Sequence, residues 1–363
     1  MSVAWIGSQP VPLADAVRTA AKLLASSRCP VFSLDADVHG TRSAIALAAV
    51  LGAAYDHRSG DAVAREVALF TDHGGMFTTP GEVRRRSSLI VLVGDIAPAH
   101  AELFKGWAGS SPDLGDKAPR RWFQVSASDQ PTRRGKAVVK AVPLKGEGLS
   151  LNATLAVLRA ELQDRTVAAP LQNVERLKKA MASAQFPVFV FSGGSLDQAG
   201  LVMLQDLIVD FNSRHRLSSL FLPDDDDAWG TVLTSLWMTG FPPRTGFINS
   251  LPSYDPVRWD VQRMIREREA DVHVWMSARG GEDPPKRGSA AVIALDKTER
   301  PARGAAVTIA VGEAGLDHDG VRYSSRVGTF TVVQAAEPSP LPSVSAVLRQ
   351  LAEAMPGKGT LIC

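Results

Sequence analysis

The chain has 363 residues, of which 45% are hydrophobic and 21% charged, and its formal net charge is +2. This length exceeds the size of one compact core, so two or more domains are expected. The small net charge gives no reason to expect nucleic acid or a membrane as a partner, and no apolar run approaches the roughly 20 residues of a membrane helix.

Apolar residues at helical spacing alternate along the chain with short, continuously apolar strands. Helices are predicted over 13–27, 41–53, 61–70, 99–107, 149–162, 171–184, 196–211, 227–237, 256–269 and 343–354. Strands are predicted over 29–35, 88–95, 120–127, 137–144, 186–194, 217–223, 271–277, 290–296 and 305–312. Apolar strands that alternate with helices are typical of parallel sheets covered on both faces, so the predicted fold class is α/β.

One order of elements occurs twice: a helix, small residues, a strand that begins Pro-Val-Phe, a turn and a second helix. It covers 13–53 and 171–211, and it predicts two related parallel α/β units. The polar stretch LQDRTVAAP, 162–170, is the candidate boundary. We therefore expect a first α/β unit, or units, over 1–165, and a second unit with a C-terminal segment over 166–363.

The stretch AAYDHRSGDAVARE, 53–66, is interpreted as a loop and holds His57, Ser59 and Asp61 close together. These residue types raise the hypothesis of a standalone hydrolase. Residues so near in sequence rarely converge as nucleophile, base and orienting group, because such triads are assembled from separate loops.

A glycine-containing turn, Ser192-Gly193-Gly194-Ser195, follows one predicted strand and opens the next helix. Backbone amides at a helix N-terminus can hold a phosphate. The chain has neither GxGxxG nor a Walker motif, and a tight turn needs glycine in any case, so the structural interpretation is favoured. The equivalent turn in the first half carries Asp35 and Asp37, which would repel a phosphate.

The runs of charged residues are likewise interpreted as structural rather than functional. The acidic run Asp224–Asp227 is typical of a solvated loop with a helix N-cap at Asp227 rather than a cation site, and LDHDG, 316–320, is a turn sequence. The seven histidines and two cysteines, Cys29 and Cys363, are not spaced as the ligands of a zinc site, and no metal site is predicted. A chain with only two cysteines is typical of a reducing compartment such as the cytoplasm. Dense basic residues usually form solvated faces, with an anionic ligand as the alternative; they are Arg84, Arg85, Arg86, Arg133, Arg134 and Lys136.

Three stretches carry a resemblance that covers nearly the whole chain: GEVRRRSSLIVLVGDIAPAH at 81–100, RRWFQVSASDQPT at 120–132 and EAGLDHDGVRYSSRV at 313–327. In their order they resemble the B subunit of formylmethanofuran dehydrogenase, a molybdopterin oxidoreductase, and most of all its shortened bacterial form in formyltransferase/hydrolase complexes. Asp129 and Asp319 match polar positions of that family, whereas His318 stands where the family has arginine. The resemblance implies Rossmann-like parallel-sheet units without the family's N-terminal iron–sulfur domain.

The chain departs from the family at its metal-binding positions. It has no cysteine-rich segment for an iron–sulfur cluster, which normally needs four thiolates. The family's cysteine or selenocysteine ligand for molybdenum or tungsten would fall near Ala62, where no sulfur lies close in sequence. These departures imply a chain with no catalytic residues, no metal and no cofactor. A vestigial pocket would be formed by Ser192, Gly193, Gly194, Ser195 and Asp129.

The resemblance therefore implies a structural subunit in one-carbon metabolism, specifically in the formaldehyde oxidation of methylotrophs. Its complex would pass a formyl group from tetrahydromethanopterin to methylofuran and release formate, with catalysis in partner subunits. The expected partners are the A, C and D subunits of the complex, in the cytoplasm, with no nucleic acid and no membrane. Contact with the polyglutamate arm of methylofuran is expected at Arg84, Arg85, Arg86, Arg133 and Arg134.

The alternative hypothesis is an enzyme that retains an organic cofactor, either a pterin or thiamine diphosphate. The repeated helix–strand–glycine unit also resembles the central domain of thiamine-diphosphate enzymes. Those enzymes need a Gly-Asp-Gly…Asn segment, which the chain lacks.

Overall fold

The structure is a computed structural model, and it describes residues 3–115, 117–127, 139–192, 194, 196–285 and 288–355. The chain divides into two compact units. Unit 1 comprises residues 1–64, 225–323 and 330–363, and unit 2 comprises residues 65–224 and 324–329.

Unit 1 is built on a nine-stranded sheet in the order β11-β10-β4-β3-β12-β13-β14-β1-β2. Its strands are β1 (Ala4–Ile6), β2 (Gln9–Pro10), β3 (Pro30–Leu34), β4 (Ala54–His57), β10 (Thr245–Ile248), β11 (Leu251–Tyr254), β12 (Val272–Ser277), β13 (Ala291–Asp296) and β14 (Val307–Ala310). The five strands from β4 to β14 are parallel, and antiparallel strands flank them on both sides.

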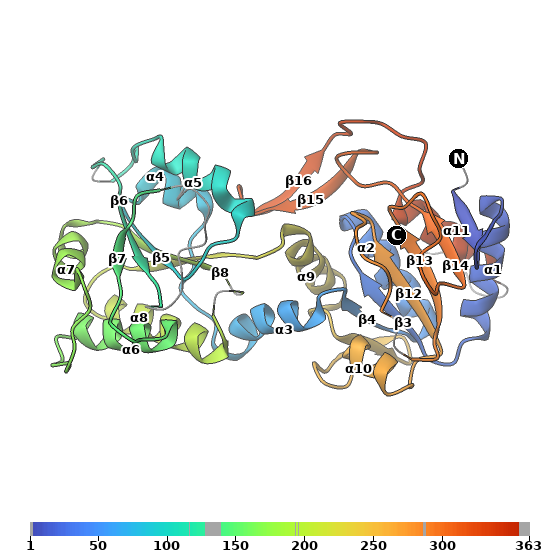
Figure 1. Cartoon of the computed structure of the whole chain (residues 1–363), viewed down its shortest axis with the longest axis horizontal. Coiled ribbons are helices and arrows are strands. Elements are labelled where there is room, and N and C mark those ends of the chain that lie inside the picture. The colour runs from blue at the N-terminus through green and yellow to red at the C-terminus, as the bar shows by residue number, and fades with distance from the viewer. Residues whose placement is uncertain are drawn as a thin grey trace. The chain divides into compact units, whose positions relative to one another are not determined.

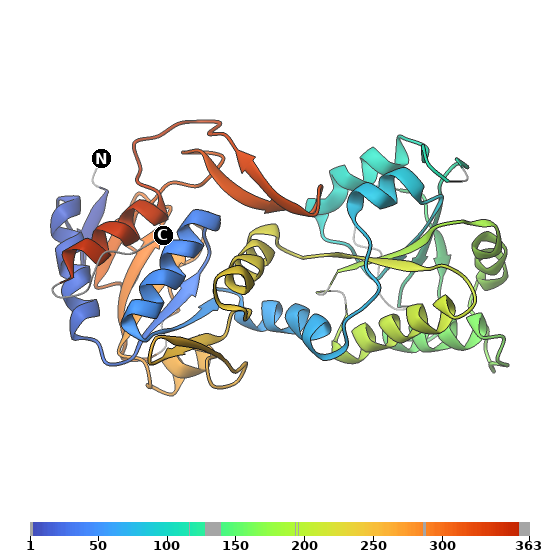
Figure 2. The same ribbon diagram turned by 180° about the vertical axis from the view of Figure 1, so that it is seen from behind.

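Helices cover both faces of this sheet, as its continuously buried central strands require. Phe32 and Leu34 of β3 pack into a core with α1 (Leu13–Ser26), α2 (Val38–Leu51) and α11 (Val344–Ala354), which lie side by side in Figure 2. Val31, which points to the opposite face, packs against α10 (Val261–Arg266). The unit also includes α9 (Asp226–Thr239), which contacts α2. A separate two-stranded sheet consists of β15 (Gly320–Ser324) and β16 (Thr329–Val333).

Unit 2 contains a five-stranded parallel sheet in the order β7-β6-β5-β8-β9. Its strands are β5 (Leu89–Val93), β6 (Arg121–Val125), β7 (Val142–Leu144), β8 (Pro187–Ser192) and β9 (Ser218–Leu222). Figure 1 shows α4 (Pro80–Arg86) and α5 (Ala101–Ala108) over one face and α6 (Leu151–Leu162) and α8 (Gln198–Asn212) over the other. The core on the second face also includes α7 (Val174–Ser183). Further helical segments are α3 (Gly60–Ala68), whose residues 60–64 belong to unit 1, a π-helical turn (Leu69–His73) and a 3-10 turn (Pro98–His100).

The predicted α/β class and its repeat are confirmed: β3 and β8 are each preceded by a helix, followed by a helix and placed inside a parallel sheet. The division into units differs from the expected boundary between 1–165 and 166–363. Strands from both ends of the chain pair in the sheet of unit 1, as β3 does with β12, so no single cut separates the two units.

Three local expectations differ from the structure. The stretch 53–66 is not a loop, because Ala54–His57 forms the buried strand β4. The hairpin of β10 and β11 was not predicted, and the expected helix over 256–269 is shorter because Asp260 caps α10 by accepting from Arg263 N. Among the helices of the described residues, none has the length and apolar character needed to cross a membrane.

Candidate functional site

The carboxyl ends of the parallel strands of unit 1 lie at one edge of its sheet. From β3 the chain proceeds to β4 on one side, whereas from β12 it proceeds to β13 on the other, so the strand order reverses between β3 and β12. In open α/β sheets, ligands bind in the crevice at such a reversal point. This edge is the candidate site, and we call it the β3/β12 crevice.

Ion pairs occupy the β3/β12 crevice. Asp35, directly after β3 and 1% exposed, pairs with Arg58 at 2.9 Å and with Arg279 at 3.1 Å. Arg279, which follows β12, also forms ion pairs with Asp225 at 2.6 Å and with Asp227 at 3.3 Å. Each buried carboxylate thus has an arginine beside it, which offsets the cost of removing charge from water.

The same network reaches α9 and the β15–β16 hairpin. Arg322 of β15 pairs with Asp227 at 2.5 Å, and Asp225 is the N-cap of α9, where it accepts from the backbone N–H groups of Asp227 and Ala228. Gly230 lets the hairpin approach α9 closely, because a Cβ there would lie 3.2 Å from the Cβ of Tyr323. The expected solvated loop at 224–227 is therefore only partly right: Asp224 is exposed, but distant arginines hold Asp225 and Asp227, and the N-cap is Asp225 rather than the predicted Asp227.

Burial governs the protonation of the crevice carboxyls. Burial raises the pKa of Asp35, although Arg279 and Arg58 act in the opposite direction. Burial also raises the pKa of Asp296, at the end of β13, to about 6. Burial would likewise raise the pKa of Asp225, but the hydrogen bond and charge of Arg279, the backbone N–H of Asp227 and the nearby His57 together outweigh burial and leave the pKa lowered.

The crevice does not fit the pterin–metal cofactor of the enzyme family that the chain resembles. Its free volume is about 10 Å³, whereas ligand pockets measure roughly 300–1,000 Å³. Its carboxylates would repel the cofactor's phosphate groups. Cys29, the one cysteine within the described part of the chain, precedes β3 and so lies at the other end of that strand. No group of three or more His, Cys, Asp and Glu among the described residues is arranged to hold a metal.

Beside the crevice, β4 carries two buried polar residues. Asp56 receives hydrogen bonds from the backbone N–H of His57 at 2.7 Å and from Arg244 Nε at 3.2 Å. Burial raises the pKa of Asp56 to about 7 against the opposing charge of Arg244. Gly60 is required nearby, because a Cβ at that position would collide with the Asp56 carboxylate.

His57 is not placed for catalysis. It is 1% exposed, its Nδ1 accepts from the backbone N–H of Ser59 at 3.0 Å, and burial lowers its pKa to about 3. Asp61 is exposed instead and pairs with Arg244 at 2.5 Å. The hydrolase hypothesis therefore has no support, since histidine and carboxylate have different partners. Ala62 lies in the first turn of α3, directly beyond β4.

The glycine turn after β8 lies at the corresponding position of unit 2, where the strand order reverses between β5 and β8. Ser192 donates a hydrogen bond to Asp224, and a Cβ on Gly194 would collide with the same carboxylate. This acidic neighbour disfavours a phosphate at the turn. Gly193 and Ser195 lie outside the described residues, as does Asp129.

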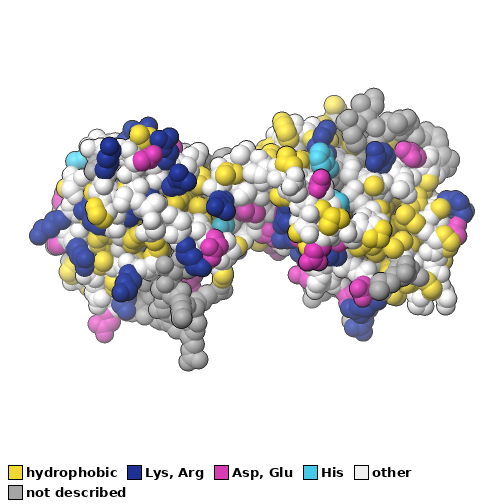
Figure 3. Space-filling model, turned by 90° about the horizontal axis from the view of Figure 1, so that it is seen from above, with side chains coloured by type: hydrophobic (Ala, Val, Ile, Leu, Met, Phe, Trp, Pro, Cys, Tyr) yellow, Lys and Arg dark blue, Asp and Glu magenta, His cyan; other side chains and the backbone are white. Residues whose placement is uncertain are grey.

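The three consecutive arginines end α4, and only one lacks an acidic partner. Arg85 pairs with Asp113 at 3.0 Å and Arg86 with Glu82 at 2.7 Å, whereas no ion pair of Arg84 occurs among the described residues. The other basic candidates, Arg133 and Arg134, lie outside the described residues. Lys and Arg side chains are spread over the face of unit 2 that α4 and α5 cover (left in Figure 3).

A groove of about 620 Å³ lies between α4 and α5. Arg84 and Arg326 line it, and Leu103 and Val327 supply apolar surface. Arg326 comes from the segment between β15 and β16 and, within the described chain, also lacks an ion pair. We call this hollow the α4/α5 groove; it combines unpaired guanidinium groups with an apolar surface.

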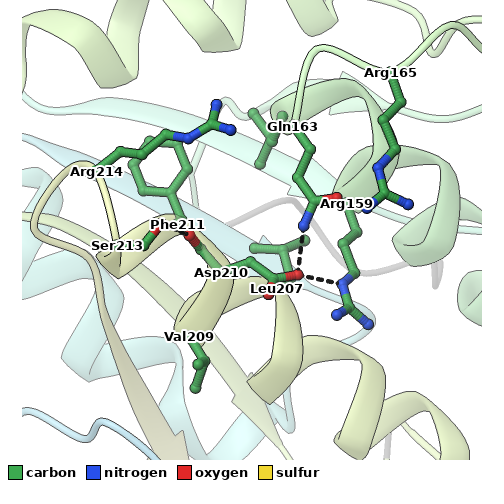
Figure 4. A pocket seen from close by; sticks show the side chains of 10 residues that line it. Arg159, Gln163, Arg165, Leu207, Val209, Asp210, Phe211, Ser213 and Arg214 are labelled. Atoms are coloured by element: carbon green, nitrogen blue, oxygen red, sulfur yellow. Dashed lines mark hydrogen bonds and ion pairs between the residues drawn. The ribbon is translucent and has the colours of Figure 1, made fainter.

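A second hollow of unit 2, of about 380 Å³, lies between α6 and α8. Arg159 and Gln163 point toward Asp210 and both hydrogen-bond to it at 2.6 Å (Figure 4). Arg159 also pairs with Asp206 at 3.0 Å. These contacts satisfy Arg159, Gln163 and Asp210 from within the chain, and the carboxylates of Asp206 and Asp210 make this hollow less suited to an external anion than the α4/α5 groove.

Sequence reasoning missed Arg279, Arg322 and Arg244, which hold the buried carboxylates together. Each is a single arginine, far from its partners along the chain and without a local motif. From the sequence, Asp35 is interpreted only as a carboxylate that would repel a phosphate. The stretch EAGLDHDGVRYSSRV includes Arg322, but the resemblance that it carries gives this arginine no role.

Comparisons with known proteins add a consistent set of relatives. The chain is 31% identical over 344 residues to the B subunit of the formyltransferase/hydrolase complex of Methylorubrum extorquens, which covers 94% of this chain and 93% of the relative. It is 21% identical over 326 residues to the B subunit of the tungsten-containing formylmethanofuran dehydrogenase 2 of Methanocaldococcus jannaschii, covering 85% and 75%. No protein-family model matches.

A solved structure is similar over the same extent. It is a chain in the crystal structure of the formyltransferase/hydrolase complex FhcABCD from Methylorubrum extorquens, in complex with methylofuran. The TM-score is 0.84 at 30% identity, and the match covers 96% of this chain and 97% of that chain. The similarity therefore extends over both units.

Proposed function

The chain belongs to the family formed by the B subunits of formyltransferase/hydrolase complexes, and from this premise we propose that it is a non-catalytic subunit of such a complex. The A, C and D subunits are its partners, and the complex passes a formyl group from tetrahydromethanopterin to methylofuran and releases formate. Catalysis takes place in the partner subunits, and this chain contributes architecture.

The filled β3/β12 crevice is the single observation that carries the non-catalytic role. A subunit that used this edge for a cofactor would need space and positively charged or neutral groups there. The chain instead places Asp35, Asp225 and Asp227 there in mutual contact with its own arginines, around a volume of about 10 Å³. The same observation disfavours the alternative hypothesis of a retained pterin or thiamine diphosphate.

Replacing His57 tests the assignment of catalysis. In the variant His57→Asn, the amide side chain keeps an acceptor for the backbone N–H of Ser59 and removes the imidazole. We expect the assembled complex to retain formyl transfer and formate release within about twofold of the wild type in kcat. A loss of kcat of about 100-fold in an intact complex, the range typical of a removed general acid or base, would contradict the proposal.

We further propose that the α4/α5 groove contacts the polyglutamate arm of methylofuran. Among the described arginines expected to bind it, Arg84 lies in the groove and has no ion pair to another described residue, and the same holds for Arg326. Guanidinium groups bind carboxylates through charge-assisted, often bidentate hydrogen bonds. The side chains of Leu103 and Val327, which line the groove, would contact the methylene groups of the arm.

The double variant Arg84→Ala/Arg326→Ala is expected to raise the KM for methylofuran about 10-fold and to leave kcat nearly unchanged, because it removes uniform binding. The effect should shrink at about 0.5 M salt, which screens exposed charges. Arg86→Ala is the matched control, since Arg86 pairs with Glu82 and does not line the groove. Equal KM values for the double variant, the control and the wild type would refute the arm contact.

A further inference from the structure

One side of the α4/α5 groove comes from a segment that is not a helix. Arg326 and Val327 line the groove and belong to residues Ser324–Thr329, which we call the hairpin tip. The hairpin tip belongs to unit 2, whereas residues 320–323 before it and 330–333 after it belong to unit 1. Because the flanking strand residues belong to another unit, contacts of the tip itself must keep Arg326 at the groove.

One buried hydrogen bond attaches the hairpin tip to unit 2. Ser325 is 6% exposed, although the four residues that follow it in the tip are all exposed. Its hydroxyl lies 3.1 Å from Nδ1 of His100, which is itself 3% exposed. Removing this hydroxyl would leave a buried imidazole nitrogen without its partner, which is unfavourable because water cannot replace it there.

The direction of this hydrogen bond follows from the other nitrogen of the ring. His100 Nε2 lies 2.8 Å from the carbonyl oxygen of Pro223, and a carbonyl can only accept, so Nε2 carries the hydrogen. The neutral imidazole has a single N–H, so Nδ1 is an acceptor and the Ser325 hydroxyl donates to it. The ring of His100 is thus fixed at both nitrogens, to the residue after β9 and to the hairpin tip.

The side chain of His100 does not cap its own helix. His100 is the N-cap residue of α5, a position where Ser, Thr, Asp or Asn usually accepts from the helix N–H groups, but its side chain makes no such hydrogen bond. Its two hydrogen bonds go to residues that are 123 and 225 positions away along the chain. The side chain therefore serves tertiary contacts, and one of these is with the segment that carries Arg326.

Further contacts make the hairpin tip a well-defined turn. The N–H groups of Val327 and Gly328 donate to the carbonyl of Ser324 at 3.2 and 2.8 Å. Gly328 has a φ of 74°, and a Cβ at this position would lie 3.1 Å from Cδ of Pro80, the first residue of α4. The tip thus contacts the start of α4 through Gly328 and, through its hydrogen bond to His100, the residue before α5.

We propose that His100 and Ser325 are positioning residues of the α4/α5 groove, and that their hydrogen bond holds Arg326 where it binds carboxylates of the polyglutamate arm. An arginine that is held in place before binding loses less conformational entropy when it binds. His100 and Ser325 act through Arg326 and do not themselves line the groove. The inference rests on the proposed function, which makes the groove the site of the arm.

Removing the Ser325 hydroxyl tests the positioning role. In the assembled complex, Ser325→Ala is expected to raise the KM for methylofuran about threefold and to leave kcat unchanged, because a looser tip weakens binding and touches no reacting group. Arg326→Ala sets the upper limit of this effect. The matched control is Ser219→Ala, which removes a buried hydroxyl that donates to the Met76 carbonyl at 3.0 Å, and it is expected to keep the KM of the wild type.

A double-mutant cycle separates positioning from a general structural role. Because the hydroxyl acts through Arg326, Ser325→Ala should change KM by less than about 1.3-fold when Arg326 is already alanine. A hydroxyl that only stabilised the fold would raise KM by the same factor in both backgrounds. Equal increases in both backgrounds, or a wild-type KM for Ser325→Ala beside a raised KM for Arg326→Ala, overturn the inference and leave the arm contact standing.

The Arg326→Ala variant also distinguishes the inference from the proposed function. An unchanged KM for Arg326→Ala overturns the inference, because there is then no contact for the tip to position. The proposed arm contact falls with it only if the double variant Arg84→Ala/Arg326→Ala also leaves KM unchanged.

A second variant disturbs the hairpin tip without removing the hydrogen bond. In Gly328→Ala, the added methyl group meets Pro80 and the positive φ is unfavourable for alanine, so the tip is displaced from α4. We expect this variant to raise KM about threefold as well, with kcat unchanged and with no further increase when Arg326 is alanine. A wild-type KM for Gly328→Ala contradicts the proposal.

Hydrogen exchange of the complex provides a readout that does not depend on activity. The amides of Val327 and Gly328 are expected to exchange about 10-fold faster in Ser325→Ala than in the wild type, because the tip opens more often. Exchange in the central strand β5 is expected to stay unchanged. Equal protection of the two tip amides in both proteins would show that the hydroxyl does not hold the tip, and would overturn the inference.

Discussion

Arg279→Met is expected to lower the free energy of unfolding by about 3–5 kcal/mol, the usual cost of removing one partner from a buried ion pair. Methionine keeps much of the length and apolar volume of the side chain, so the lost charge dominates. Asp35 is 1% exposed and Asp227 6% exposed, and both lose a cation within 3.3 Å. Arg58 and Arg322 remain to neutralise them only in part.

Arg85→Met is the matched control for this prediction. Arg85 also pairs with an aspartate, Asp113, at 3.0 Å, but both side chains are more than half exposed. Exposed pairs contribute about 0–1 kcal/mol. Urea unfolding of the two variants and the wild type measures the difference. If both variants lose the same small free energy of unfolding, solvent rather than Arg279 stabilises the charge of the crevice carboxylates, and the prediction is wrong.

Asp56→Asn is expected to gain stability relative to the wild type as the pH rises from about 4 to about 7. Burial raises the pKa of Asp56 from its ordinary 3.8 to about 7. In this window the folded wild type holds a proton that the unfolded chain has released, so its stability falls with rising pH. Asparagine carries no such proton. The difference corresponds to at most about 4 kcal/mol, from 1.36 kcal/mol per pKa unit.

Unfolding of both proteins in urea at several pH values from about 4 to about 8 measures this difference. Asp61→Asn is the control, since it removes an exposed carboxylate from the same arginine and is expected to change stability by less than about 1 kcal/mol. A stability difference between Asp56→Asn and wild type that falls with rising pH would show that the pairing with Arg244 outweighs burial and lowers the pKa of Asp56.

Strands that are apolar except for at most a single serine could be predicted from the sequence, and every residue of β3, β5 and β8 is buried. The strand β4 could not, since its sequence Ala-Tyr-Asp-His holds two polar residues. The buried carboxyl of Asp56 is paired with Arg244, 188 residues away. A strand whose buried carboxyl has such a distant partner has no local signal.

The candidate site shows the same limit. The position of Asp35 at the end of a strand follows from the predicted elements, and Asp224–Asp227 is visible as an acidic run. Their interpretation failed because the compensating charges come from after β12 and from β15. The resemblance to the B subunit, in contrast, depends on the order of many weak motifs along the chain. This order can be recognised from the sequence, whereas a single ion pair between distant residues cannot.

The metal and pterin content of the purified complex tests the central claim most directly. The native assembly that contains this chain should be isolated gently, and molybdenum, tungsten and released pterin quantified per copy of the chain by elemental analysis and mass spectrometry. The account predicts less than about one-tenth of an equivalent of each. One equivalent of molybdenum or tungsten together with one or two of pterin, bound to this chain, would contradict it.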